Sequence, residues 1–261
     1  MSGFDAKDST SSEHSDLWLE GLLNNPTLTT NDAGSRTIGL PREYYADIGV
    51  GGPELEAARR QLEALGYRCQ DISLPHTDAA IPAYYVIAGA EASTNLSRYD
   101  GVRFGHRCED PTSLDDLYER SRGEGFGGEV KRRILTGTYA LSVGYYDAYY
   151  VKAQKVRRLI QQDFLKAFEQ VDMILAPVAP STAFTIGGVQ DPVSMYQQDR
   201  FTIPASLAGL PAMSVPCGMH QGMPLGLQLI APHFHERSLL ECGASYQQQT
   251  DWHQQHPPAI T

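Results

Sequence analysis

The chain has 261 residues, with 31 acidic and 21 basic side chains and a net charge of −10. Hydrophobic residues make up 41% and charged residues 20%, which is ordinary for a folded globular protein and excludes general disorder. Because no run of about 18 apolar residues is present, no transmembrane helix is predicted.

The N-terminus and the cysteines both favour a cytoplasmic protein. The first eight residues are polar and lack the apolar core of a signal peptide. The four cysteines are widely spaced and form no CxxC pair, which favours reduced thiols over a disulfide framework: Cys69, Cys108, Cys217 and Cys242. The negative charge disfavours direct binding to the phosphates of a nucleic acid.

The chain is expected to begin with an extended polar segment over residues 1–35, in which only Leu17–Leu23 has an apolar pattern typical of a short helical or docking piece. A domain over residues 36–261 follows. Its first elements are a strand at Thr37–Pro41, a helix at Pro53–Leu65 and a strand at Tyr67–Leu74, an order that predicts a parallel βαβ unit.

The middle of the chain is predicted to be helical. Its longest periodic segment has six apolar residues on one face, namely Val156, Leu159, Ile160, Phe164, Phe168 and Val171. The predicted helices are Pro82–Leu96, Leu114–Ser121, Gly128–Leu135 and Val143–Val171, and the strand Asp172–Pro177 follows them.

The C-terminal part alternates short helices and strands. We expect a helix at Pro192–Asp199, strands at Ala212–Val215 and Leu225–Ala231, and a closing helix at Glu236–Gln248. The whole pattern predicts an α/β protein.

Several common catalytic signatures are absent: the sequence has no P-loop, HExxH or GxSxG motif. His233 and His235 could share a metal with Cys242, but a third ligand is not evident, and a polar loop is the favoured interpretation. Cys217 could be a nucleophile next to His220. It is expected at a strand end among apolar residues, where an inert thiol is more common.

A tyrosine-rich run places Tyr145 and Tyr149 four residues apart, and Tyr146 and Tyr150 likewise. Two aromatic pairs are therefore predicted on adjoining helix faces. Helix packing is favoured over base stacking because Asp147 and the acidic composition oppose a nucleic-acid surface.

Three consecutive cations, Lys131, Arg132 and Arg133, lie at a predicted helix. Since they cannot all face one way, we expect at least one to turn inward, where a carboxylate from the protein or from a ligand would have to meet it. From composition alone a solvated face is the favoured interpretation.

Several motifs in a fixed order resemble one family. They include YYVIAGAEAS at residues 84–93, YDGVRFG at 99–105, GFGGEVKRRI at 125–134, MYQQD at 195–199, LAGLPA at 207–212 and PLGLQL at 224–229. Together they are similar to the A subunits of bacterial glutamine-dependent Glu-tRNA(Gln)/Asp-tRNA(Asn) amidotransferases, which are members of the amidase signature family. The resemblance covers almost the whole chain and implies a mixed β-sheet covered by helices.

The resemblance also implies that the catalytic residues are missing. In this family the Lys, the cis-Ser and the nucleophilic Ser all precede the motif that matches residues 7–10 here, so the N-terminal half of the fold is absent. No catalytic residue is therefore predicted in this chain, which should be inactive alone and expose apolar surface where the missing half would pack. A truncated gene model, a split gene and a designed fragment remain open as the origin.

The residues that the resemblance assigns to substrate binding are present in this chain. The resemblance implies that Arg133 binds the α-carboxylate of glutamine, that Asp199 meets its α-amino group, and that Tyr84 contributes to the same pocket. The residue types agree, since a planar guanidinium suits a carboxylate and an acid suits an ammonium group.

In the complete complex the family implies that glutamine is hydrolysed through an acyl-enzyme and that ammonia passes to the B subunit. There Glu-tRNA(Gln) or Asp-tRNA(Asn) is amidated with ATP and magnesium, while the C subunit holds the pair together; which tRNA is used stays open. No cofactor or metal is expected in this chain. Two alternatives remain: a fragment of an amidase acting on aryl or fatty amides, and a non-catalytic half of a split protein.

Overall fold

The computed structural model describes residues 4–12, 36–46, 48–188 and 191–257. The chain divides into two compact units, here called the sheet unit (Met1–Asp78 and Ile160–Thr261) and the helical unit (Ala79–Leu159). Of the predicted N-terminal segment only residues 4–12 are described, so the Leu17–Leu23 stretch lies outside the described residues.

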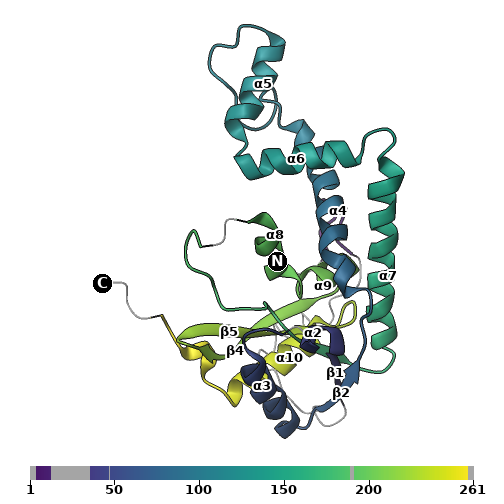
Figure 1. Ribbon diagram of the computed structural model, residues 1–261, viewed down its shortest axis with the longest axis vertical. Helices are drawn as coiled ribbons and strands as arrows, with labels where there is room; N and C mark the ends of the chain where they lie inside the picture. The colour runs from purple at the N-terminus through teal and green to yellow at the C-terminus, as the bar shows by residue number, and fades with distance from the viewer. Residues whose placement is uncertain (1–3, 13–35, 47, 189–190, 258–261) are drawn as a thin grey trace. The chain divides into compact units, whose positions relative to one another are not determined.

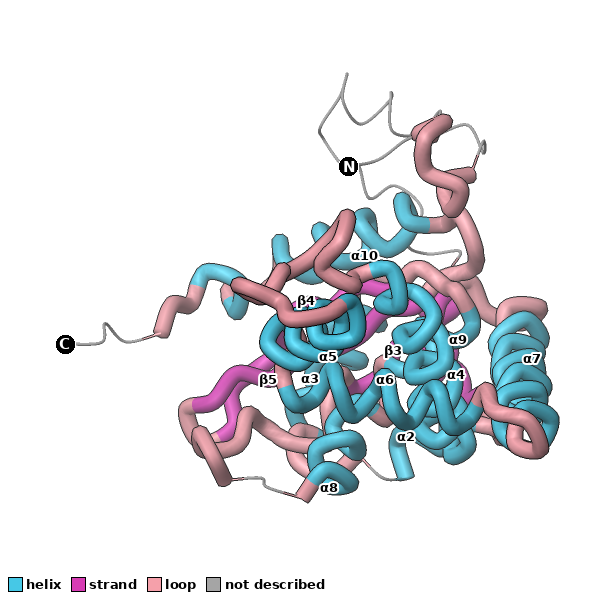
Figure 2. The backbone as a smooth tube through the Cα atoms, turned by 90° about the horizontal axis from the view of Figure 1, so that it is seen from above, coloured by secondary structure: helices cyan, strands magenta, loops and turns pink. Residues whose placement is uncertain are grey.

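The sheet unit contains one mixed five-stranded sheet in the described part of the chain, with the order β2-β1-β3-β5-β4. Strand β1 pairs in parallel with β2 and β3, whereas β5 pairs in antiparallel with β3 and β4. Figures 1 and 2 show these strands, whose bounds are β1 Thr37–Pro41, β2 Arg68–Ile72, β3 Met173–Pro177, β4 Ala212–His220 and β5 Met223–Ile230.

The predicted βαβ unit is confirmed. Helix α3 (Gly52–Ala64) has a proline in its first turn, buries Leu55 and Leu62 on one stripe, and is followed by Gly66 at φ +100°. It connects the parallel strands β1 and β2, after the short helix α2 (Arg42–Ala46).

The main core lies on the face of the sheet that is covered by α3 and by α10 (Glu236–Gln248), a helix whose predicted bounds are confirmed. Side chains alternate along a strand, so Leu227 and Leu229 face this core and Gln228 faces the opposite side. On that opposite side the Gln228 amide donates to the carbonyl of Phe201, at 2.9 Å. Phe201 precedes α9 (Ile203–Ala208).

The helical unit is organised around α4 (Ala80–Asn95) and α6 (Gly128–Ala140), which contact each other and cross in Figure 1. The two helices approach closely at Gly89 and Gly137: a Cβ atom on Gly137 would lie 1.9 Å from the Gly89 carbonyl oxygen. Helix α5 (Leu114–Gly125) and α6 are both longer than predicted.

The predicted helix over Val143–Val171 is wrong in its extent. Residues Tyr146–Val151 form a π-helical turn, and the α-helix proper, α7, spans Lys152–Ala167. Leu159 is 41% exposed rather than on the buried face. The reason is that Ala153, Ile160, Phe164 and Ala167 form the buried stripe of α7, and Leu159 lies off it.

The remaining elements are short. Helix α8 (Pro192–Tyr196) continues into the 3-10 turn η5 (Gln197–Asp199), and further 3-10 turns lie at Thr77–Ala79, Leu96–Arg98 and Trp252–Gln254. Strand β4 extends to His220, so Cys217 lies within the strand and not at its end. Within the described ranges, no helix has the length and apolar character needed to cross a membrane.

Candidate functional site

Two of the three predicted substrate-binding residues lie in the helical unit. Tyr84 is half-buried on α4, and its ring meets that of Tyr85 edge-on, with 5.1 Å between the ring centroids. Arg133 lies on α6 with its side chain 48% exposed, and its Nε is 3.4 Å from a carboxylate oxygen of Glu129 one turn earlier. An exposed ion pair of this length is weak, so a ligand carboxylate can compete for the guanidinium.

The prediction that one cation of the basic cluster turns inward is wrong, because Lys131, Arg132 and Arg133 are all exposed. Helix α6 buries only Gly137 and Ala140, so most of its circumference is open to solvent. Glu129 pairs with both arginines, and the Lys131 ammonium donates to the Gly123 carbonyl at 3.0 Å. The solvated-face interpretation therefore describes this cluster.

The third predicted residue, Asp199, lies in the sheet unit at the end of η5 with an exposed side chain. The backbone carbonyl of Asp199 accepts a hydrogen bond from the Thr202 backbone N–H, at 3.1 Å, and this bond closes the turn. The preceding α8 is capped by Asp191, whose carboxylate accepts from the Ser194 N–H at 2.9 Å. These hydrogen bonds to Ser194 lower the pKa of Asp191.

The predicted tyrosine pairs are confirmed. The ring centroids are 5.9 Å apart for Tyr145 and Tyr149 and 5.4 Å apart for Tyr146 and Tyr150. Tyr139 of α6 joins the first pair, with its ring 4.4 Å from that of Tyr145. A hydrogen bond to Tyr145, with partial desolvation, raises the pKa of Tyr139 to about 12, so this hydroxyl stays protonated at neutral pH.

The thiols have the environment of inert cysteines. Cys217 is 4% exposed, and burial together with the nearby Glu54 carboxylate raises its pKa to about 12. His220 instead faces Glu54, with 3.6 Å between its Nδ1 and a carboxylate oxygen. Since the thiolate is the nucleophilic form, burial and the raised pKa both disfavour Cys217 as a nucleophile near neutral pH.

Cys242 and the two histidines proposed to share a metal do not form a ligand set. Cys242 is fully buried in the core, whereas His233 and His235 are exposed on the loop before α10. Among the residues that the structure describes, no group of three or more His, Cys, Asp or Glu side chains could hold a metal ion.

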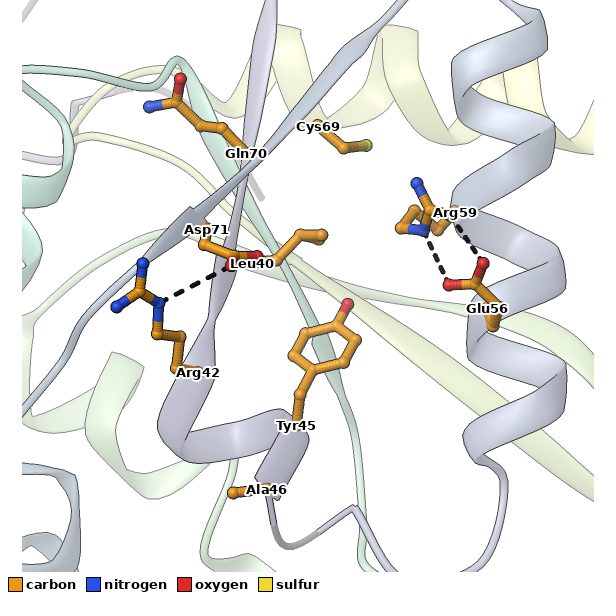
Figure 3. A pocket seen from close by; sticks show the side chains of 9 residues that line it. All are labelled: Leu40, Arg42, Tyr45, Ala46, Glu56, Arg59, Cys69, Gln70 and Asp71. Atoms are coloured by element: carbon orange, nitrogen blue, oxygen red, sulfur yellow. Dashed lines mark hydrogen bonds and ion pairs between the residues drawn. The ribbon is translucent and has the colours of Figure 1, made fainter.

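A groove of about 660 Å³ in the sheet unit was missed by the sequence analysis (Figure 3). It lies between α2, α3 and the edge strand β2, and its lining residues are Leu40, Arg42, Tyr45, Ala46, Glu56, Arg59, Cys69, Gln70 and Asp71. They come from three separate segments and share no motif, so only the fold reveals that they are neighbours.

The charges of this groove are paired within the chain. Arg59 makes a two-point contact with Glu56, at 2.7 and 2.6 Å, and Arg42 Nε lies 3.7 Å from Asp71. In Figure 3 the Tyr45 ring is seen between these two pairs. Burial raises the pKa of Tyr45 and raises that of the Cys69 thiol to about 11, so neither group is ionised at neutral pH. The groove is therefore suited to structural ion pairing and offers no activated nucleophile.

Comparison with known proteins places the chain in a family. The amidase family model matches residues 3–240. The A subunit of glutamyl-tRNA(Gln) amidotransferase from Chromohalobacter salexigens is 60% identical over 234 residues, which cover 88% of this chain and 48% of that protein. The corresponding protein of Saccharophagus degradans is 55% identical over 263 residues, which cover 100% of this chain and 53% of that protein.

A solved structure agrees with these relatives. The crystal structure of the A subunit of glutamyl-tRNA(Gln) amidotransferase from Thermotoga maritima superposes with a TM-score of 0.64 at 37% identity, covering 84% of this chain and 43% of that one. The chain thus spans about half the length of the curated relatives it matches. On the matched family model and these identities, the chain belongs to the amidase family.

Proposed function

We propose that this chain is the C-terminal part of an amidotransferase A subunit that hydrolyses glutamine and supplies ammonia for the amidation of Glu-tRNA(Gln) or Asp-tRNA(Asn). The observation that carries the proposal is the 55–60% identity to proteins named as A subunits of glutamyl-tRNA(Gln) amidotransferase, which extends over nearly the whole chain. The enzyme class would be a carbon–nitrogen ligase with glutamine as amide donor, acting in the cytoplasm.

The substrate pocket would use Arg133, Asp199 and Tyr84. An exposed guanidinium held by one weak ion pair can bind the α-carboxylate of glutamine, and the exposed carboxylate of Asp199 can meet the α-ammonium group. Both groups favour a free amino acid over the apolar amides that general amidases hydrolyse.

The chain would depend on partners for chemistry. The family's Lys and two Ser residues would come from the part of the A subunit that this chain does not span, and they would carry the acyl transfer. The B subunit would bind the tRNA, ATP and magnesium, and the C subunit would hold the complex together. The net charge of −10 is consistent with tRNA binding by a partner rather than by this chain.

The test is a complementation assay. The chain is mixed with the part of the Chromohalobacter salexigens protein that the match leaves out, and glutamate release from glutamine is measured. We expect turnover only in the mixture, since the chain alone lacks a nucleophile. Turnover by the chain alone would overturn the proposal.

A matched pair of variants tests the pocket. Arg133→Ala is expected to raise the KM for glutamine about 10- to 100-fold with a smaller change in kcat, as loss of a charge-assisted hydrogen bond in the ground state predicts. Arg132→Ala removes the neighbouring cation of the same helix and should leave KM unchanged. Equal effects of the two variants, or hydrolysis of aryl amides that glutamine does not inhibit, would contradict the glutamine pocket.

A further inference from the structure

A pocket of about 210 Å³ in the sheet unit lies where α3, β4 and the C-terminal end of α10 meet. Its walls include Glu54, Ala58, Cys217, Gly218, Tyr246 and Trp252. Among the described residues that line the pocket there is one acidic side chain and no Lys or Arg. The pocket therefore contains a carboxyl group without a basic side chain in its walls.

The carboxyl group of Glu54 is poorly paired. Its Oε2 atom is enclosed by protein and has no hydrogen-bond partner in the described part of the chain. Its Oε1 atom lies 3.6 Å from Nδ1 of His220, which is longer than a hydrogen bond. An enclosed oxygen without a donor has lost its hydration and gained nothing in return. A ligand that donates hydrogen bonds to this group recovers that cost.

The backbone of two elements holds Glu54 in this place. The residue lies in the first turn of α3, where the helix dipole favours a negative charge. On β4 the ladder shifts its register between Pro216 and Gly218. A Cβ atom on Gly218 would lie 2.9 Å from Cγ of Glu54, so a larger residue would displace the stem of the side chain. The bulge and the glycine thus leave room for the carboxyl group against the strand.

The other walls of the pocket are aromatic or apolar. Tyr246 is 2% exposed, and the partly buried Trp252 packs against the main core. Aromatic rings attract cations, and apolar walls accept a hydrocarbon stem. A bare metal ion is disfavoured, because Ca²⁺ and Mg²⁺ need several oxygen ligands. At about 30 Å³ for each water-sized group, the volume holds about seven such groups.

We propose that this pocket binds a short alkylammonium ion, whose –NH₃⁺ group donates to the Glu54 carboxylate and whose stem lies against Tyr246 and Trp252. An ammonium group has three donors and no acceptor, which matches an under-paired carboxylate. The terminal torsion of Glu is broad, so the carboxylate can turn an oxygen toward the ligand. The proposal does not rest on the proposed function, because none of the residues assigned to glutamine binding lines the pocket.

The test is titration of the full chain with n-butylammonium chloride, followed by calorimetry and by tryptophan fluorescence. The chain has two tryptophans, and a Trp18→Phe background leaves Trp252 as the reporter. We expect a Kd on the order of 1 mM, because a ligand of about five non-hydrogen atoms makes few contacts. n-Butanol has the same stem without the charge and should bind about tenfold more weakly or less, since the charge-assisted hydrogen bond is lost.

Variants separate the carboxylate from its surroundings. Glu54→Gln keeps the shape of the side chain and should raise the Kd for n-butylammonium about tenfold or more. Glu63→Gln removes the same charge from an exposed position of α3 outside the pocket and should change the Kd less than about twofold. Each variant alone is examined by circular dichroism and thermal melting. If Glu54→Gln does not fold, Trp252→Leu tests the pocket with the carboxylate in place, and the Kd should rise about threefold.

Four results would overturn the proposal: failure of n-butylammonium to bind the wild-type chain, equal affinity for n-butanol, wild-type affinity in Glu54→Gln, or equal weakening by Glu63→Gln. The titration is repeated with the remaining part of the Chromohalobacter salexigens protein present. If that segment abolishes n-butylammonium binding, and Glu54→Gln weakens binding of the segment itself, a lysine side chain of the segment supplies the ammonium group. Unchanged n-butylammonium binding assigns the pocket to a free amine.

Discussion

The sheet unit and the helical unit are each stabilised internally, and the kind of packing differs between them. In the sheet unit all five residues of β3 are buried, and large side chains such as Ile38, Leu62, Phe164 and Leu175 are almost completely enclosed. In the helical unit the buried apolar residues are mainly alanines, and α4 and α6 approach through paired glycines. One unit is stabilised by buried volume and the other by close backbone contact.

Both units also expose large apolar side chains. The helical unit leaves large apolar side chains exposed, among them Phe104, Leu135, Tyr139, Val143, Tyr145 and Tyr146. Of these, Leu135 and Tyr139 belong to α6, and the sheet unit exposes Ile186 and Val193 in the same way. The two units should consequently respond to opposite kinds of substitution: the sheet unit to loss of volume and the helical unit to gain of volume.

The largest effect is expected from Leu175→Ala in the sheet unit. Leu175 is fully buried in the central strand β3, so truncation removes apolar burial and leaves a cavity, at a cost of about 3 kcal/mol of unfolding free energy. Urea unfolding followed by circular dichroism measures it. Leu165→Ala is the control, since Leu165 is 39% exposed and its truncation should cost well under half as much. Comparable losses in the two variants would contradict a close-packed core at β3.

An intermediate effect is expected from Gly137→Ala in the helical unit. The added Cβ would meet the Gly89 carbonyl at 1.9 Å, and the helices must separate, at a cost of about 1–3 kcal/mol. Hydrogen exchange of the α4 and α6 amides reports this locally. Gly128→Ala in the same helix has open space around its added methyl group and should slow exchange or leave it unchanged. Faster exchange in Gly128→Ala than in Gly137→Ala would refute the glycine contact.

The smallest effect is the onset, near pH 9, of an alkaline loss of stability in the sheet unit. Burial raises the pKa of Cys217 and of Cys242 from 9.0 to about 12, so folding favours the protonated thiols. The two raised pKa values contribute to the free energy of unfolding in full below about pH 9. This contribution is lost as the pH rises toward 12. Each thiol contributes a slope of at most about 1.4 kcal/mol per pH unit.

The measurement is the melting temperature between pH 7.5 and 10.5. Cys217→Ala should lower it at pH 7.5 but flatten its decline above pH 9, because one titrating group has been removed. An undiminished decline in that variant would show that other groups, such as the buried tyrosines, cause the alkaline loss.

Much of the fold could be predicted because local signals and tertiary packing agree. The proline that opens α3 and the glycine that follows it mark the helix correctly, and α10 begins and ends at the predicted residues. The predicted buried face of α7 was wrong, because tertiary packing buries some of its apolar residues and leaves others exposed. Leu159 fits a broad apolar stripe in the sequence, yet α7 buries a narrower one through Ala153 and Ile160.

The site could be predicted only in part. Arg133, Asp199 and Tyr84 were assigned from motifs, and their roles remain proposals. The prediction that one cation of the basic cluster faces inward is wrong. A helix buries only the part of its circumference that its neighbours cover, and in α6 the buried residues are Gly137 and Ala140. The groove beside β2 has no sequence signature at all, because its residues come from distant segments.

By itself, the sequence determined the α/β class, the order of helices and strands, and the family, since periodicity, helix-terminal residues and ordered motifs are local properties. Only the tertiary structure decided that β4 is an outer strand of the sheet in the described part of the chain and that Ala212 and Ser214 lie exposed on it. Strand order and cover arise from pairings between segments far apart in the chain, and those pairings leave no mark on the local pattern of a single strand.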